Sequence, residues 1–99
     1  MIRWTRSARI TPGNVLHTMQ WGKEIAELVN KKYKTQVSVY MDYFGEYGTI
    51  RWFCDYPDLA AFEKLANQLI TDQEYIGKLK SGTGLLTPGS AFDTVMRAI

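Results

Sequence analysis

The chain has 99 residues, of which 45% are hydrophobic and 13% aromatic, with 12 basic and 10 acidic side chains. Abundant aromatic residues and balanced charge exclude a disordered or collagen-like chain, and the length predicts one domain spanning residues 1–99. A net charge of +2 disfavours a nucleic-acid binder that works through a basic stripe. One cysteine and one histidine are too few for a zinc site of Cys and His ligands within one chain, so no metal is expected.

Membrane insertion and secretion are not expected. No apolar run reaches the roughly 18 residues of a spanning helix, and the segment Met1–Arg6 lacks the apolar stretch of a secretion signal. Cys54 has no second cysteine to pair with, which fits a reducing compartment. We therefore expect a cytoplasmic protein that makes no membrane contact.

The first third of the chain predicts a strand and then a helix. Residues 1–10 alternate, with Ile2, Trp4, Ala8 and Ile10 on one face and Arg3, Thr5, Ser7 and Arg9 on the other. Turn residues at 11–14 precede an amphipathic helix that runs from Val15 to Tyr33. Its apolar arc is wide enough to meet a neighbouring helix or a second chain as well as a sheet.

Residues 36–55 predict two strands, 36–44 and 49–55, joined by a short hairpin at Gly45–Gly48. A symmetric turn would set Asp42 opposite Arg51, Tyr40 opposite Phe53 and Met41 opposite Trp52. The hairpin then has two unlike faces. The apolar face carries Val37, Val39, Met41, Ile50, Trp52 and Cys54, and the mixed face carries Ser38, Tyr40, Asp42, Arg51 and Phe53.

The remaining residues predict a helix, a shorter helix and a closing strand. Pro57 suits the first position of a helix that continues to about residue 70. The segment Thr71–Glu74 matches a capping box, so a short helix restarts there. Phe92, Thr94 and Val95 favour a strand in the segment 91–99, although its last residues also suit a helix.

This order of elements is the ferredoxin-like βαββαβ arrangement, an α+β fold in which helices cover one face of a four-stranded antiparallel sheet. The other face would carry Tyr40 and Phe53 among polar groups. Such a surface is too apolar to be left in water, so we expect a second copy of the chain to cover it.

Several segments resemble the dimeric α+β barrel superfamily, and particularly its NIPSNAP-like branch. The likeness lies in Tyr47–Leu59, in Leu69–Tyr75 and in the pair Pro12–Gly13 before the first helix. The resemblance implies a homodimer whose two sheets close into one barrel, with a cavity between sheet and helices in each subunit. The wider superfamily includes cofactor-independent monooxygenases, haem-degrading enzymes and proteins of no known activity, so the fold leaves function open.

The mixed face of the hairpin provides the first candidate site. Arg3, Tyr40, Asp42, Arg51 and Phe53 would cluster on the barrel side, where Asp42 stays ionised between arginines and orients a ligand or accepts a proton. The competing interpretation is a cross-strand ion pair that stabilises the dimer.

His17 is the one side chain with an unperturbed pKa near neutrality, so it is the second candidate proton acceptor, although a packing or surface role is the simpler interpretation. Haem-degrading relatives carry their ligand histidine on a later helix, where this chain has none, so no haem or other cofactor is expected. The parity of Cys54 places it in the core, away from catalysis. Trp4, Trp21 and Trp52 would form core or line a cavity for an apolar ligand.

The sequence therefore predicts a NIPSNAP-like homodimer that binds a small apolar or aromatic molecule. The first alternative is a monooxygenase-like or isomerase-like enzyme, with Asp42 or His17 as proton acceptor, Arg51 at an oxyanion, and Trp52 and Tyr40 shaping the cavity. The second is an RNA-recognition module that stacks bases on Tyr40 and Phe53, although the third strand lacks the signature of that module.

Overall fold

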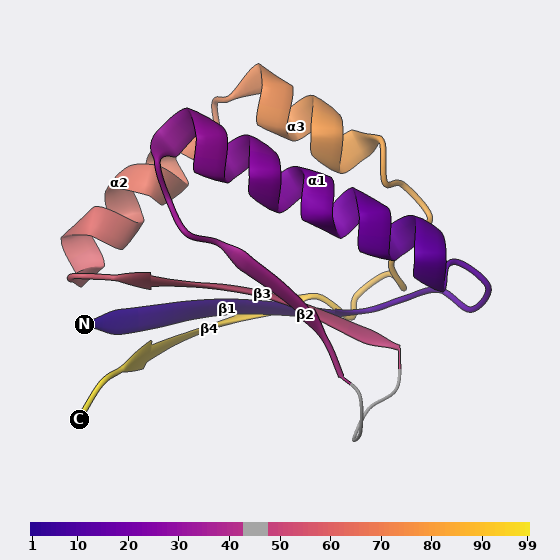
Figure 1. Ribbon diagram of the computed structural model, residues 1–99, viewed down its shortest axis with the longest axis horizontal. Coiled ribbons are helices and arrows are strands. Elements are labelled where there is room, and N and C mark those ends of the chain that lie inside the picture. Colours follow the sequence, from indigo (N-terminus) through magenta and orange to yellow (C-terminus); the bar gives the residue numbers. More distant parts are fainter. Residues whose placement is uncertain (43–47) are drawn as a thin grey trace.

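The computed structural model describes residues 1–42 and 48–99, and within them it contains an antiparallel sheet of four strands with three helices on one face (Figure 1). The strands are β1 (Ile2–Arg9), β2 (Ser38–Met41), β3 (Thr49–Tyr56) and β4 (Phe92–Arg97), in the order β2-β3-β1-β4. The helices are α1 (Val15–Tyr33), α2 (Leu59–Leu69) and α3 (Gln73–Lys80). The predicted α+β ferredoxin-like fold is confirmed, including a closing strand within residues 91–99.

The central strand β1 pairs with β3 on one side and with β4 on the other. The pairing with β3 runs from Ile2 opposite Tyr56 to Arg9 opposite Thr49. Because side chains alternate along a strand, the even-numbered residues of β1 face the helices and the odd-numbered residues face the opposite side. We call that opposite side the helix-free face. It carries alternate residues of all four strands.

The hairpin of β2 and β3 has a register that differs from the prediction by two residues. Met41 pairs with Ile50 and Tyr40 with Arg51, whereas a symmetric turn would have paired Met41 with Trp52. The predicted pairing was wrong because it assumed a symmetric turn at Gly45–Gly48, and the observed pairs are offset from that arrangement by two residues. A shift of two residues keeps every side chain on its predicted face. Of the predicted turn Gly45–Gly48, residues 45–47 lie outside the described residues.

The second and third helices begin one or two residues later than predicted. Asp58 is the N-cap of α2, so Pro57 precedes the helix and does not occupy its first position. Asp72 is the N-cap of α3 in place of Thr71. Each aspartate accepts a hydrogen bond from the backbone N–H three residues later, at 2.9 Å and 3.0 Å respectively. An aspartate caps a helix at least as well as threonine does, which explains the shift at α3.

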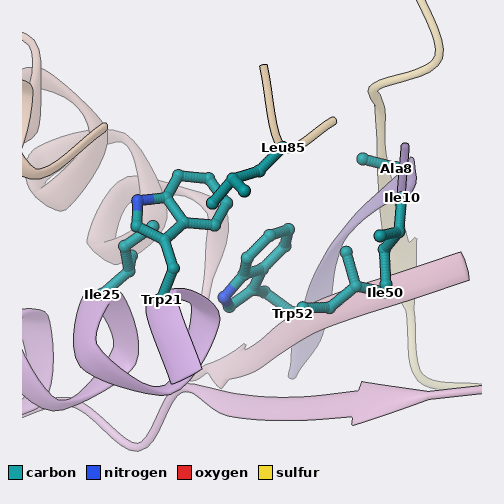
Figure 2. Packing of buried hydrophobic residues seen from close by; sticks show 7 residues of the cluster. All are labelled: Ala8, Ile10, Trp21, Ile25, Ile50, Trp52 and Leu85. Atoms are coloured by element: carbon teal, nitrogen blue, oxygen red, sulfur yellow. The ribbon is translucent and has the colours of Figure 1, made fainter. Parts of the chain in front are cut away.

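The main core cluster joins α1 to the sheet and to the segment after α3 (Figure 2). Its buried members are Ala8, Ile10, Trp21, Ile25, Ile50, Trp52 and Leu85. The rings of Trp21 and Trp52 meet edge to face, with centroids 5.9 Å apart. Helix α1 approaches the sheet closely because Gly22 has no side chain: a Cβ there would lie 2.8 Å from Cδ1 of Ile50.

Strand β4 is exposed along its whole length, unlike β3. Phe92 is 60% exposed and Met96 47% exposed, and both lie on the helix-free face. Tyr40, at the other edge of the same face, is 59% exposed. The helix-free face therefore presents apolar surface at both of its edges.

Within residues 1–42 and 48–99, no helix has the length and apolar character needed to cross a membrane.

Candidate functional site

A cavity of about 720 Å³ lies between the sheet and the helices. Side chains from β1, β3, all three helices and the segment that enters β4 line it. They are mostly apolar or aromatic, and they include Trp4, Trp21, Ile25, Val29, Trp52, Phe62, Leu65, Leu69, Ile76 and Leu79. Each of the three tryptophans that the sequence placed in the core or at a cavity contributes to this wall.

The charged side chains among the described lining residues are Arg6 of β1 and Asp93 of β4. The two residues pair directly across the strands. Their contact has two hydrogen bonds: Nε of Arg6 donates to Oδ1 of Asp93 at 2.7 Å, and Nη2 donates to Oδ2 at 2.9 Å. Nε1 of Trp4 also donates to Oδ2 of Asp93, at 3.2 Å. We call Arg6 and Asp93 the cavity ion pair.

The cavity ion pair is held in its charged form. Its hydrogen bonds from Arg6 lower the pKa of Asp93 below the ordinary range of a carboxyl, and the indole of Trp4 contributes in the same direction. The bonds to Asp93 raise the pKa of Arg6, and the neighbouring Tyr75 adds to this increase. Tyr56, elsewhere on the wall, has a raised pKa chiefly because it is buried. The phenol of Tyr56 therefore stays neutral at physiological pH.

The residues predicted from the hairpin come together on the helix-free face and not at the cavity. Arg51 makes two hydrogen bonds to Asp42, at 2.8 Å and 3.0 Å, and a third to Oγ of Ser7 at 2.8 Å. These bonds from Arg51 lower the pKa of Asp42. The rings of Tyr40 and Phe53 stack with centroids 5.0 Å apart. The shifted register still allows these contacts because diagonal neighbours on a sheet lie within reach of long side chains.

Arg3 extends the same cluster along β1. It makes two hydrogen bonds to Asp55, at 2.7 Å and 3.0 Å, and its guanidinium carbon lies 5.0 Å from the centroid of the Phe53 ring. Phe53 therefore already contacts both Tyr40 and Arg3. An RNA-recognition module needs aromatic ring faces that are free to stack on bases. The rings of Tyr40 and Phe53 stack on each other, so part of their surface is not available for that role.

The other predicted site residues are separated. Trp52 lines the cavity, whereas His17 is exposed on α1 and is not one of the described lining residues. Cys54 is buried in the core, as its parity predicted. Among residues 1–42 and 48–99, no group of three or more His, Cys, Asp or Glu side chains is arranged to hold a metal ion.

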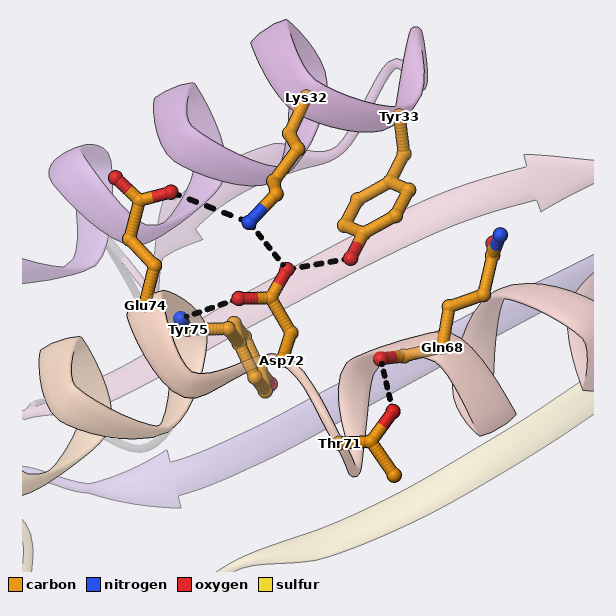
Figure 3. Close-up of polar contacts among 7 residues, drawn as sticks. All are labelled: Lys32, Tyr33, Gln68, Thr71, Asp72, Glu74 and Tyr75. Atoms are coloured by element: carbon orange, nitrogen blue, oxygen red, sulfur yellow. Dashed lines mark hydrogen bonds and ion pairs between the residues drawn. The ribbon is translucent and has the colours of Figure 1, made fainter.

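A second polar cluster joins the end of α1 to the start of α3 (Figure 3). The buried carboxylate of Asp72 accepts hydrogen bonds from the hydroxyl of Tyr33 and from the backbone N–H of Tyr75, and it pairs with Nζ of Lys32 at 2.9 Å. These contacts lower the pKa of Asp72 well below the ordinary range. The partners of Asp72 lie at the end of α1 and at the start of α3, so these contacts hold the two helices together. We therefore assign this cluster a structural role.

Sequence reasoning missed the cavity ion pair. Arg6 has the same parity as Trp4 and Ala8, so it is a charged residue at an inward-facing position of a strand. Such a residue needs a partner of opposite charge on the same side of the sheet. Asp93 has that parity on β4. The signal was present in the alternation, but only the pairing of β1 with β4 reveals the partner.

Solved structures match this fold over almost the whole chain. An uncharacterized NIPSNAP domain protein from Burkholderia xenovorans aligns with a TM-score of 0.84 at 14% identity, covering 100% of this chain and 95% of that one. A NIPSNAP family protein of unknown function from Agrobacterium tumefaciens gives 0.83 at 15% identity, covering 99% and 87%. An antibiotic biosynthesis monooxygenase gives 0.73 at 13% identity, covering 100% and 99%. No family model and no curated protein matches the chain.

These alignments, together with the strand order, define an α+β protein of the ferredoxin-like class. Within that class the fold is the one found in NIPSNAP proteins, which confirms at the level of fold the resemblance read from the sequence. Identities near 14% concern the fold and carry no activity with them.

Proposed function

We propose that this protein, a single domain over residues 1–99, binds a small apolar or aromatic molecule in the cavity between its sheet and its helices. The observation that supports this proposal is the cavity itself. Its volume of about 720 Å³ lies within the range of small-molecule sites, roughly 300 to 1,000 Å³, and its wall combines mostly apolar and aromatic side chains with a few polar groups, as such sites commonly do.

The experiment fills the cavity without changing its polar groups. Ala66 of α2 lines the cavity, and Ala66→Phe places a ring in the space that a ligand would occupy. Ala60→Phe is the matched control, because Ala60 is exposed on the same helix and is not one of the described lining residues. The probe is ethylnaphthalene, and equilibrium dialysis measures its binding. We expect Ala66→Phe to weaken binding at least tenfold and Ala60→Phe to leave it unchanged.

Two results would contradict the proposal. One is the absence of saturable binding of the probe to the wild type. The other is equal binding of the probe by the wild type and by Ala66→Phe. Thermal unfolding would demonstrate that Ala66→Phe and the control Ala60→Phe are folded. The second result would mean that the probe sits elsewhere on the molecule, for example on the exposed helix-free face.

We also propose that two copies of the chain associate through the helix-free face. Support comes from the exposed apolar side chains at both edges of that face, Tyr40 on β2 and Phe92 and Met96 on β4. Burying them against an identical surface removes apolar area from water, the dominant favourable term in association. The proposed location remains the cytoplasm, supported by the single buried thiol of Cys54.

A second candidate function is a monooxygenase-like or isomerase-like reaction. It is favoured by the alignment with an antibiotic biosynthesis monooxygenase, whose activity belongs to that protein. The cavity ion pair would then provide the polar groups next to the substrate, because Asp42, Arg51 and His17 are not among the described lining residues. Oxygen uptake during incubation with a naphthol, absent in a heat-denatured sample, is the measurement that tests the monooxygenase-like reaction.

A further inference from the structure

We propose that the cavity ion pair of Arg6 and Asp93 selects a neutral ligand: an apolar or aromatic body that carries one hydrogen-bond-accepting oxygen, such as a carbonyl, and no net charge. This inference rests on the proposed function, since it names the class of molecule that the same cavity takes.

The tryptophans of the wall offer ring surface and no hydrogen bonds. Nε1 of Trp21 donates to the carbonyl of Lys78 at 2.9 Å, and Nε1 of Trp52 donates to the carbonyl of Gly22 at 3.1 Å. Nε1 of Trp4 donates to Asp93. Each indole has one N–H, so none of the three remains for a ligand. The tryptophans therefore supply a flat apolar surface, and the polar side chains of the described wall are the ion pair and the tyrosines Tyr56 and Tyr75.

Asp93 has little capacity left to accept. Its two oxygens already receive three N–H groups, two from Arg6 and one from Trp4. A ligand that depends on donating, such as an amine, would find about one acceptor position left on this carboxylate. The wall also presents no second anion among its described residues, so a cationic ligand would find its only countercharge already paired.

Arg6, in contrast, has donors to spare. A guanidinium has five N–H groups, and the bonds to Asp93 come from Nε and Nη2. The hydroxyl of Tyr75 also takes part in a hydrogen bond with this side chain. These three contacts use at most three of the five N–H groups, so Arg6 keeps donors for a ligand. An oxygen that accepts from Arg6 would complete the polar end of the cavity without breaking the ion pair.

The charge balance argues against an anionic ligand. Arg6 and Asp93 neutralise each other at 2.7 Å, so a carboxylate beside Arg6 would also lie beside the carboxylate of Asp93. Both side chains are partly exposed, at 38% and 41%, which places the pair at the mouth of the cavity. A neutral acceptor at that position accepts a hydrogen bond from Arg6 and is not repelled by the carboxylate of Asp93.

The test compares four naphthalenes that differ only in the group on one ring carbon: ethyl, acetyl, carboxylate and aminomethyl. Equilibrium dialysis at neutral pH gives the affinity of the wild type for each. We expect the acetyl compound to bind about tenfold tighter than the ethyl compound, a factor equal to about 1.4 kcal/mol, because only the former accepts a hydrogen bond. The two charged compounds should bind more weakly than the acetyl compound.

A double variant then locates the preference. Arg6→Met with Asp93→Asn removes both charges at nearly constant volume, and it should reduce the acetyl preference to about twofold or less while ethyl binding persists. The matched control is Glu24→Gln with Lys78→Met, which removes an ion pair between α1 and α3 that is outside the cavity wall. This control should keep the tenfold preference.

The outcomes separate this inference from the proposed function. If the ethyl compound binds in the cavity but the acetyl compound binds no tighter, or if the carboxylate binds best, the inference is overturned and the proposed function stands. If no naphthalene binds, both are overturned. The series on the wild type decides the matter alone should the double variant fail to fold.

Discussion

Replacing Gly82 with alanine would place a methyl group inside the indole of Trp21, a residue of the cavity wall. A Cβ built at Gly82 lies 2.2 Å from Cε2 and 2.4 Å from Cζ2 of that ring. Carbon atoms in ordinary contact are about 3.5 Å apart, so the indole has to move by about 1.3 Å. The ring is fixed on its other sides by the hydrogen bond to Lys78 and by the edge-to-face contact with Trp52.

The loss of folding stability follows from the contacts of Trp21 that the movement of its indole disturbs. Overpacking a core typically costs about 1–3 kcal/mol. Weakening the buried hydrogen bond of Trp21 adds about 1 kcal/mol, and the smaller freedom of the unfolded chain returns about 0.5 kcal/mol. We therefore expect a net loss of about 1.5–3.5 kcal/mol, which lowers the Tm by roughly 6 to 28 °C in a chain of this length.

Thermal unfolding followed by circular dichroism measures the loss, and Gly77→Ala is the matched control. Gly77 lies within α3, and nothing lies within 4 Å of its built Cβ. Alanine there should stabilise the helix by roughly 0.5–1 kcal/mol, so the two glycine replacements should move the Tm in opposite directions. A Tm for Gly82→Ala that equals or exceeds that of the wild type would refute the packing of Trp21 on this turn.

Two further predictions concern the polar cluster and the helix-free face. Asp72 has a lowered pKa in the folded protein, so its contribution to stability is present above about pH 4 and is lost as the pH falls further. The gap in Tm between the wild type and Asp72→Asn should accordingly narrow from pH 7 to pH 3; a constant gap would contradict this. Met96→Lys should weaken self-association at least tenfold in sedimentation velocity, whereas Val95→Lys, on the opposite face of β4, should not. Equal effects, or a wild type that stays monomeric, would exclude the dimer.

The sheet faces were predictable from the sequence because alternation is a local property. Ile50, Trp52 and Cys54 were assigned to the helix-covered side from parity alone, and all three are buried. The same period placed Tyr40 and Asp42 on the other side, where they lie. A shift of register by two residues leaves this assignment intact, which is why the faces were right although the pairing was wrong.

The pairing and the helix starts were less predictable because each depends on a choice between close alternatives. The register of β2 against β3 was predicted from a symmetric turn at Gly45–Gly48, and a pairing offset by two residues keeps the same side chains on each face, so the alternation of residues does not distinguish the two. At the start of α3, Thr71 and Asp72 both offer a capping oxygen. The contacts of Asp72 with Lys32 and Tyr33, on a helix far away in the sequence, favour the aspartate.

The cavity ion pair demonstrates why residue type alone does not reveal a site. Arg3 and Arg6 both lie on β1, and each makes two hydrogen bonds to an aspartate with nearly the same distances. Arg3 has odd parity and meets Asp55 on the helix-free face, whereas Arg6 has even parity and meets Asp93 across 87 residues of sequence. Only the strand order β2-β3-β1-β4 brings Asp93 beside Arg6. The charged pair at the cavity therefore depends on the last strand in the sequence, and a ligand that contacts this pair bridges the first and last elements of the chain.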